Sequence, residues 1–130
     1  MTIISCIPVV PSADLDKSLR LWRDGLGFTE TWWEARSPEG RLIGCGIRKD
    51  HMSFMLNQRA GTPEKPEDYE GVRFYWAPND LHALRQHLKQ LGYVVSDVEV
   101  RDYGQTEFFL TDDDGFSHCF GVATEKAANS

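Results

Sequence analysis

Hydrophobic and polar positions follow two different periods along this chain, and the order of the two periods repeats. An apolar run over Ile3–Val10 ends at Pro11, which is typical of a strand. Apolar residues then recur at helical spacing from Leu15 to Leu26, behind Ser12 or Asp14 as a cap. Three further strand-like runs follow, over residues 28–35, 41–48 and 51–56. The first half therefore predicts the order βαβββ.

The same order starts again in the second half. An apolar and aromatic run over residues 72–77 ends at Pro78, and four leucines then lie on one side of a helical pattern capped by Asn79 or Asp80. Strand-like runs follow over residues 94–100, 106–110 and 116–122. The Leu-Gly-aromatic triplet at 26–28 recurs at 91–93. The agreement of caps, glycines and strands indicates an internal repeat.

These patterns predict an α+β fold built from two tandem βαβββ modules. A helix covers one face of each small sheet, so two modules side by side make one curved, mixed, eight-stranded sheet with a concave cleft. We expect a single domain over residues 1–123, with pseudo-repeats at 1–57 and 70–123, and a flexible tail at 124–130. The polar segment 57–70 reads as a surface linker that joins the halves or covers a site.

The last two strand-like runs are joined by a short acidic stretch, Thr111–Gly115. Asp and Gly accept the backbone conformations of a tight turn, so the pattern predicts a hairpin. The three consecutive aspartates resemble a calcium loop only superficially, because an EF-hand spreads its ligands over about twelve residues. His51 and His118 are expected beside hairpin turns, and His82 and His87 on the polar side of the second helix.

Composition and charge exclude several function classes. The chain has 130 residues and a net charge of −6, which argues against nucleic-acid binding because phosphate recognition needs a basic face. The first residues show neither a basic leader nor a long apolar run, so we expect no signal peptide and no membrane span. Three widely spaced cysteines argue against a disulfide framework and fit a cytoplasmic protein.

Four stretches together resemble the vicinal oxygen chelate superfamily, which includes glyoxalases and bleomycin resistance proteins. They are residues 7–18 (IPVVPSADLDKS), 26–28 (LGF), 103–108 (YGQTEF) and 112–115 (DDDG). The resemblance covers nearly the whole chain and is greatest to the bleomycin resistance branch. An aromatic residue at Trp32 and a phenylalanine at Phe54 match that branch, while Thr106 and Ser37 depart from it and put bleomycin itself in doubt as the ligand.

The enzymes of this superfamily hold a divalent metal between four inward residues. Counted from the helix caps, those positions fall at Ile7, Phe54, Arg73 and Cys119. Of these four only Cys119 could bind an ion, and one ligand makes no site. Carbon side chains cannot bind an ion, and arginine is a fixed cation. We therefore expect no metal, no cofactor and no catalytic residue. A shift of one residue would bring other donors near these positions, namely Asp50, His51 and His118.

The resemblance implies a homodimer that binds a small molecule in a cleft between its subunits. Trp32 would stack on an aromatic ligand, and Glu34, expected on the same strand face, would face a positive charge. Trp33, expected on the opposite face, and Trp22, on the helix, would pack in the core. For Trp32 a purely structural role stays equally open.

Five further residues complete the expected ligand-binding set. Phe54 and Tyr75 would point into the cleft, where they either line it or fill it. An inward Arg73 would pair with an anionic ligand group or with Glu107. The remaining two are Tyr103, in the matching motif, and Cys119, although a cysteine in such a place is more often a small buried hydrophobe.

The sequence thus favours a metal-independent protein that sequesters an aromatic molecule, which could be a cationic drug or metabolite. The alternative is a metal-dependent lyase, isomerase or dioxygenase of the glyoxalase type with a displaced ligand set. A third hypothesis is a relative whose cleft is filled by its own side chains.

Overall fold

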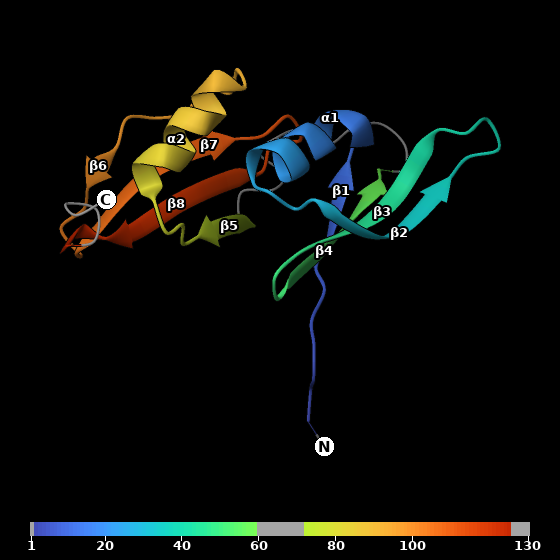
Figure 1. The fold of residues 1–130 in the computed structure, drawn as a ribbon, viewed down its shortest axis with the longest axis horizontal. Helices are drawn as coiled ribbons and strands as arrows, with labels where there is room; N and C mark the ends of the chain where they lie inside the picture. Colours follow the sequence, from blue (N-terminus) through green and yellow to red (C-terminus); the bar gives the residue numbers. More distant parts are fainter. Residues whose placement is uncertain (1, 60–71, 126–130) are drawn as a thin grey trace. The chain divides into compact units, whose positions relative to one another are not determined.

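The protein contains two sheets with the same topology. A computed structural model describes residues 2–59 and 72–125. The chain divides into two compact units, Met1–Glu64 and Lys65–Ser130, and each unit holds one four-stranded mixed sheet and one helical segment (Figure 1). The strand orders are β1-β4-β3-β2 and β5-β8-β7-β6. The α+β class and the two tandem βαβββ modules are therefore confirmed.

The elements lie close to the ranges expected from the sequence. The first module contains β1 (Val9–Ser12), α1 (Leu15–Leu19), the π-helix η1 (Arg20–Gly25), β2 (Glu30–Arg36), β3 (Leu42–Lys49) and β4 (Met52–Gln58). The second module contains β5 (Arg73–Trp76), α2 (Leu81–Gln90), β6 (Glu99–Val100), β7 (Gln105–Thr111) and β8 (Ser117–Ala123).

The first helix begins as predicted and then widens. Asp14 caps α1 by accepting a hydrogen bond from the backbone N–H of Lys17 at 3.2 Å. The N–H of Leu26 donates to the carbonyl of Leu21, five residues earlier, at 2.8 Å, which is the bond of a π-turn. Gly27 then ends the segment with φ +86°.

The helical segment covers one face of the first sheet. Helix α1 packs against β3 and β4. Trp22 is buried, and its ring lies 5.8 Å from that of Phe28 and 4.9 Å from that of Phe54. These three rings form the aromatic part of the core of this module, as expected for Trp22 and contrary to the expectation for Phe54.

In the second module the core also lies on the helix-covered face. Asp80 caps α2 by accepting from the N–H of Ala83 at 3.0 Å, and Leu81 and Leu88 are fully buried. The rings of Phe108 and Phe120, opposite each other on β7 and β8, stack 4.7 Å apart. Helix α2 packs against β8 on this side (Figure 1).

The predicted hairpin is also confirmed. Asp112 donates its backbone N–H to the carbonyl of Phe116 at 2.9 Å, and its Oδ1 accepts from the N–H groups of Asp114 and Phe116. Gly115 takes φ +91°. The aspartates therefore build a turn.

Two strand ranges differ from the expectation. Strand β1 starts at Val9 and runs across Pro11, which is tolerated because β1 is an edge strand of its sheet. The run over 94–100 forms a strand only at Glu99–Val100, because Ser96 uses its own hydroxyl to accept from the N–H of Phe109 at 2.7 Å. Most of the expected linker and tail, residues 60–71 and 126–130, lies outside the described residues.

Candidate functional site

In each module one sheet face is covered by a helix, and the opposite, helix-free face carries the candidate chemistry. Residues opposite each other in neighbouring strands project to the same side of a sheet. On β3, Cys45 and Ile47 are buried on the helix-covered face, so Gly44, Gly46 and Arg48 belong to the helix-free face. The strand register therefore decides which predicted site residues can come together.

Two tryptophans lie over the glycines of the first helix-free face. A Cβ atom added to Gly46 would lie 2.4–2.7 Å from three indole carbons of Trp32. A Cβ atom added to Gly44 would lie 2.8 and 2.9 Å from two indole carbons of Trp33. The missing side chains thus leave room for both indoles to lie close to the backbone of β3. We call Trp32 and Trp33 together the tryptophan platform.

The expectation that Trp33 lies opposite Trp32 was wrong. A register shift between Thr31 and Trp33 inserts an extra residue in β2, and such a bulge breaks the alternation of side chains. Trp33 keeps 38% of its surface exposed, and Trp32 is half-buried. Both rings are therefore presented on one face.

Trp32 is held in place by its polar edge and by a cation. Its Nε1–H donates to the carbonyl of Ile47 at 3.3 Å. The guanidinium carbon of Arg48 lies 5.9 Å from the centre of the indole. Arg48 is fixed in turn by Ser53 and Glu30, at 3.1 Å and 3.4 Å. These contacts favour one ring orientation before any ligand is present.

Glu34 and Phe54 do not join the platform, so these two expectations were wrong. Beyond the bulge, Glu34 pairs with Cys45, which is buried on the helix-covered face, and its carboxylate lies 3.3 Å from Arg36. Phe54 pairs with Ile47 on the same covered face. A shift of one residue exchanges the faces of a strand, which is why positions counted from the helix caps failed here.

The second helix-free face is organised around a buried carboxylate. The side chain of Glu107 is only 1% exposed. Its Oε2 accepts the hydroxyl of Tyr75, and its Oε1 accepts the hydroxyl of Tyr103. Arg101 approaches Oε1 to 3.4 Å with Nε and pairs through Nη1 with Glu99 at 2.9 Å. A buried charge needs such compensation.

Tyr75 reaches Glu107 by crossing β8 at a glycine. A Cβ atom on Gly121 would lie 2.7 Å from the Tyr75 hydroxyl and 3.2 Å from Cγ of Glu107. The two tyrosines keep most of their surface exposed, 60% for Tyr75 and 63% for Tyr103, while their hydroxyls are anchored. The structure thus places both of these predicted residues on one face.

Arg73 lies on the same side of β5 as Tyr75 and is exposed. The expected ion pair between Arg73 and Glu107 is not formed, because Arg101 takes that place. The structure therefore brings together Arg73, Tyr75, Tyr103 and Cys119 of the predicted set. Sequence reasoning named Glu107 only as a partner of Arg73, and it missed Arg101 and the two tyrosine hydroxyls as the partners that Glu107 has.

Cys119 is buried beside this carboxylate. Burial, followed by the negative charge of Glu107 and a hydrogen bond to it, raises the pKa of the Cys119 thiol to about 12. Burial, with the nearby charge of Glu34, also raises the pKa of Cys45. Both cysteines are therefore neutral thiols near pH 7, which makes them poor nucleophiles and poor metal ligands.

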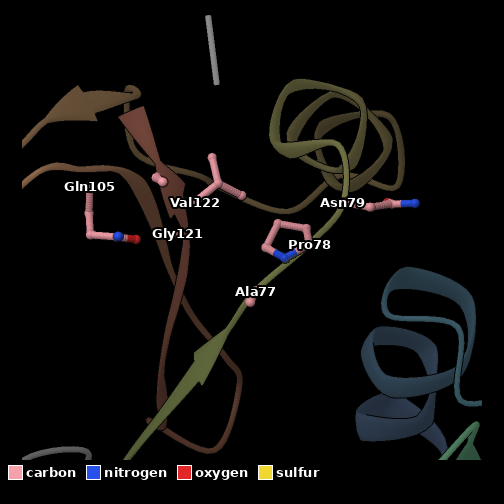
Figure 2. A pocket seen from close by; sticks show the side chains of 7 residues that line it. Ala77, Pro78, Asn79, Gln105, Gly121 and Val122 are labelled. Atoms are coloured by element: carbon pink, nitrogen blue, oxygen red, sulfur yellow. The ribbon is translucent and has the colours of Figure 1, made fainter. Parts of the chain in front are cut away.

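A pocket of about 510 Å³ opens at the end of β5 (Figure 2). Strand β5 pairs with β8 only as far as Trp76 and Phe120, after which Pro78 leads the chain to α2. The gap is lined by Ala77, Pro78, Asn79, Gln105, Gly121, Val122 and Ala123. Since Gly121 also contacts the Tyr75 hydroxyl, the pocket adjoins the Glu107 cluster.

His118, expected beside the hairpin turn, is fully buried on the helix-covered face. The indole N–H of Trp76 donates to its Nδ1 at 3.0 Å, so the ring proton lies on Nε2, 2.8 Å from Oδ2 of Asp112. The ring also stacks on Phe74 at 5.0 Å. The three polar residues tie the hairpin to β5. The sequence signal that could have suggested this contact is the spacing of Asp112 and His118, which lie six residues apart on either side of the predicted hairpin turn.

The residues at the superfamily's metal positions do not fit a metal ion. Ile7 offers only carbon, and Phe54 lies on the other face. Arg73 is a cation, and the Cys119 thiol keeps its proton. Within the part of the chain that the structure describes, no three His, Cys, Asp or Glu side chains lie close enough to share an ion. That same part contains no helix that is long and apolar enough to span a bilayer.

Comparison with known proteins gives a consistent family assignment. A model of the glyoxalase/bleomycin resistance protein/dioxygenase superfamily matches residues 7–120. The glutathione transferase FosA of Serratia marcescens is 30% identical over 119 residues, covering 89% of this chain and 80% of that protein.

Solved structures share the fold. A glyoxalase-related enzyme from Clostridium phytofermentans aligns with a TM-score of 0.70 and 20% identity, over 95% of this chain and 97% of that one. A bleomycin-binding protein from Streptomyces verticillus, complexed with copper(II)-bleomycin, aligns with a TM-score of 0.62 and 19% identity, over 92% and 96%.

Proposed function

The chain belongs to the glyoxalase/bleomycin resistance protein/dioxygenase superfamily, and we propose that it is a metal-independent protein that binds and sequesters a small aromatic molecule. The observation that carries this proposal is the tryptophan platform. Trp32 and Trp33 lie on one sheet face over Gly46 and Gly44, and the bond to Ile47 orients one ring in advance. Stacking on a ring contributes about 0.5–1.5 kcal/mol beyond the area that it buries.

The metal-independent part of the proposal is supported by the chemistry of the second face. Glu107, a carboxylate that could otherwise attract a cation, already accepts from two tyrosines and faces Arg101. The neighbouring Cys119 keeps its proton. A divalent ion would have to displace these partners, and among residues 2–59 and 72–125 no three His, Cys, Asp or Glu side chains lie close enough to hold it.

A structural relative that carries bleomycin in its own structure makes that class of drug a natural first probe. We further propose a homodimer, as the family resemblance implies, and a cytoplasmic location. Three free thiols support a reducing compartment, namely Cys6, Cys45 and Cys119. Light scattering after gel filtration tests the dimer, with a single 14.8 kDa species as the outcome against it.

The binding function is tested by calorimetric titration of chelator-treated protein with metal-free bleomycin and with a panel of planar aromatic drugs. Trp32→Phe should keep binding within about threefold, because a ring remains. Trp32→Ala should weaken it at least tenfold, since the stacking and its buried area are both lost. Equal binding by the two variants would remove Trp32 from the site.

The rival function is a metal-dependent enzyme, favoured by the 30% identity to a glutathione transferase. Metal analysis of protein purified without chelator separates the two hypotheses. Stoichiometric zinc, manganese, iron or nickel that survives dialysis would support the enzyme. Metal well below one equivalent, together with drug binding in chelator, would support sequestration.

A further inference from the structure

The second helix-free face presents an exposed cation next to an exposed ring. Arg73 and Tyr75 are two residues apart on β5, so their side chains leave the same face of the sheet. The Tyr75 side chain is fixed at its far end by the hydrogen bond to Glu107, although most of its surface is exposed. A ring that is oriented beforehand loses less conformational freedom on binding.

The acidic groups of this face are already paired with a cation. Arg101 forms ion pairs with both Glu99 and Glu107. Glu107 is buried beneath the two tyrosine hydroxyls, so a ligand cannot contact it directly. Among residues 2–59 and 72–125, by contrast, none of the ion pairs includes Arg73. A ligand that reaches Arg73 therefore contacts an exposed guanidinium, whereas the buried carboxylate of Glu107 stays out of its reach.

The neighbouring strand β8 places uncharged residues beside Arg73 and Tyr75. Cys119 lies opposite Tyr75 in the register of β5 and β8, and Ser117 lies opposite Arg73. Cys119 is buried and carries no charge near pH 7. Neither of these two residues carries a charge that would oppose an anion next to the guanidinium, and the carboxylate that Cys119 contacts, Glu107, is buried and paired with Arg101.

We propose that Arg73 and Tyr75 form a binding site for a planar aromatic anion, whose ring stacks on Tyr75 and whose carboxylate or sulfonate pairs with Arg73. The inference goes beyond the proposed binding function, because it assigns a separate site in the second module and the charge of the ligand that this site takes. It also reverses the cationic preference that depended on Glu34, which lies with Arg36 on the other face of its strand. An arginine can hold a carboxylate by two parallel hydrogen bonds, which gives both strength and orientation.

The test compares three ligands that share the naphthalene ring and carry an anionic, a neutral and a cationic group: 2-naphthoate, 2-naphthylmethanol and 2-naphthylmethylamine. Binding is measured by calorimetry on the full chain at low salt and at 0.5 M salt. We expect the naphthoate to bind at least fivefold more tightly than the amine, and this preference to shrink at high salt. Arg73→Gln should weaken the naphthoate about tenfold and leave the alcohol unchanged.

Two further variants make the result specific. Arg41→Gln removes an exposed arginine from the first module and should leave all three affinities unchanged. Tyr75→Ala should weaken naphthoate and alcohol alike, since it removes the ring and not the charge. The inference is overturned if the amine binds as tightly as the naphthoate, if Arg73→Gln has no effect, or if none of the three ligands binds.

The outcome also separates this inference from the proposed function. Loss of drug binding in Trp32→Ala with no effect of Arg73→Gln on naphthoate would leave the tryptophan platform standing and remove the anion site. The opposite result would retain the anion site and remove the platform.

Discussion

Adding one methyl group to Gly46 should disturb Trp32 and little else. The Cβ atom that Gly46→Ala introduces would lie 2.4–2.7 Å from three indole carbons, closer than such atoms are found in folded proteins. The indole must therefore move, and its hydrogen bond to Ile47 at 3.3 Å and its contact with Arg48 at 5.9 Å weaken with it.

Two opposing effects set the size of the change. Overpacking a formed structure costs about 1–3 kcal/mol. Replacing glycine by alanine where φ is not positive, as at Gly46, stabilises by about 0.4–1 kcal/mol, because the unfolded chain has fewer conformations to lose. The overpacking is the larger effect, so we expect Gly46→Ala to lower the free energy of unfolding by about 1–2 kcal/mol.

Urea denaturation followed by far-ultraviolet circular dichroism measures this loss without depending on tryptophan emission. The decisive experiment adds the same change to Trp32→Ala. In the Trp32→Ala background the added methyl group meets no indole, so Gly46→Ala should be neutral or slightly stabilising. The interaction free energy between the two substitutions should therefore be at least about 1 kcal/mol. If Gly46→Ala costs the same in both backgrounds, Trp32 does not lie over Gly46 and the platform is wrongly built.

The other expectations centre on the second module. His118→Phe should cost about 2–4 kcal/mol in urea denaturation, because it removes the hydrogen bonds that His118 forms with the indole N–H of Trp76 and with Oδ2 of Asp112; a loss below about 0.5 kcal/mol would show that these hydrogen bonds do not form. Iodoacetamide at pH 7.5 should alkylate exposed Cys6 within minutes and spare Cys119 in the folded protein, as read by peptide mass spectrometry. Folding raises the pKa of the Cys119 thiol to about 12, so the stability that the neutral thiol contributes is complete below pH 9. The free energy of unfolding should therefore fall as the pH rises from 9 toward 12, and it should fall less in a Cys119→Ala variant. Leu88→Ala should cost about 2–5 kcal/mol in the same denaturation assay, as the truncation of a fully buried leucine.

The sequence was sufficient for the architecture because that information is local and repeated. Helix caps at Asp14 and Asp80, the glycines after each helix and the alternating runs each predict their own element, and the second half repeats the first. The turn at Asp112–Gly115 follows from residues that are adjacent in the chain. Such signals need no knowledge of distant contacts.

The faces of the strands were decided by tertiary structure. One extra residue in β2 brings Trp33 to the side of Trp32 and takes Glu34 away, and nothing in the local composition marks that bulge. Phe54 faces the helix because its partner across the strand pair is Ile47, which is a matter of register.

The partners of the charged groups were likewise decided only when the strands came together. The sequence contains Arg73, Arg101 and Glu107, and it does not say which arginine meets the carboxylate. The sheet places Arg101 against Glu107, and Gly121 lets the Tyr75 hydroxyl reach across a strand to the same carboxylate. The sequence thus determined which reactive and charged groups this chain carries, and the strand register determined on which face each of them lies. The physical reason is that a shift of one residue in the pairing of two strands moves every side chain of the shifted strand to the opposite face of the sheet.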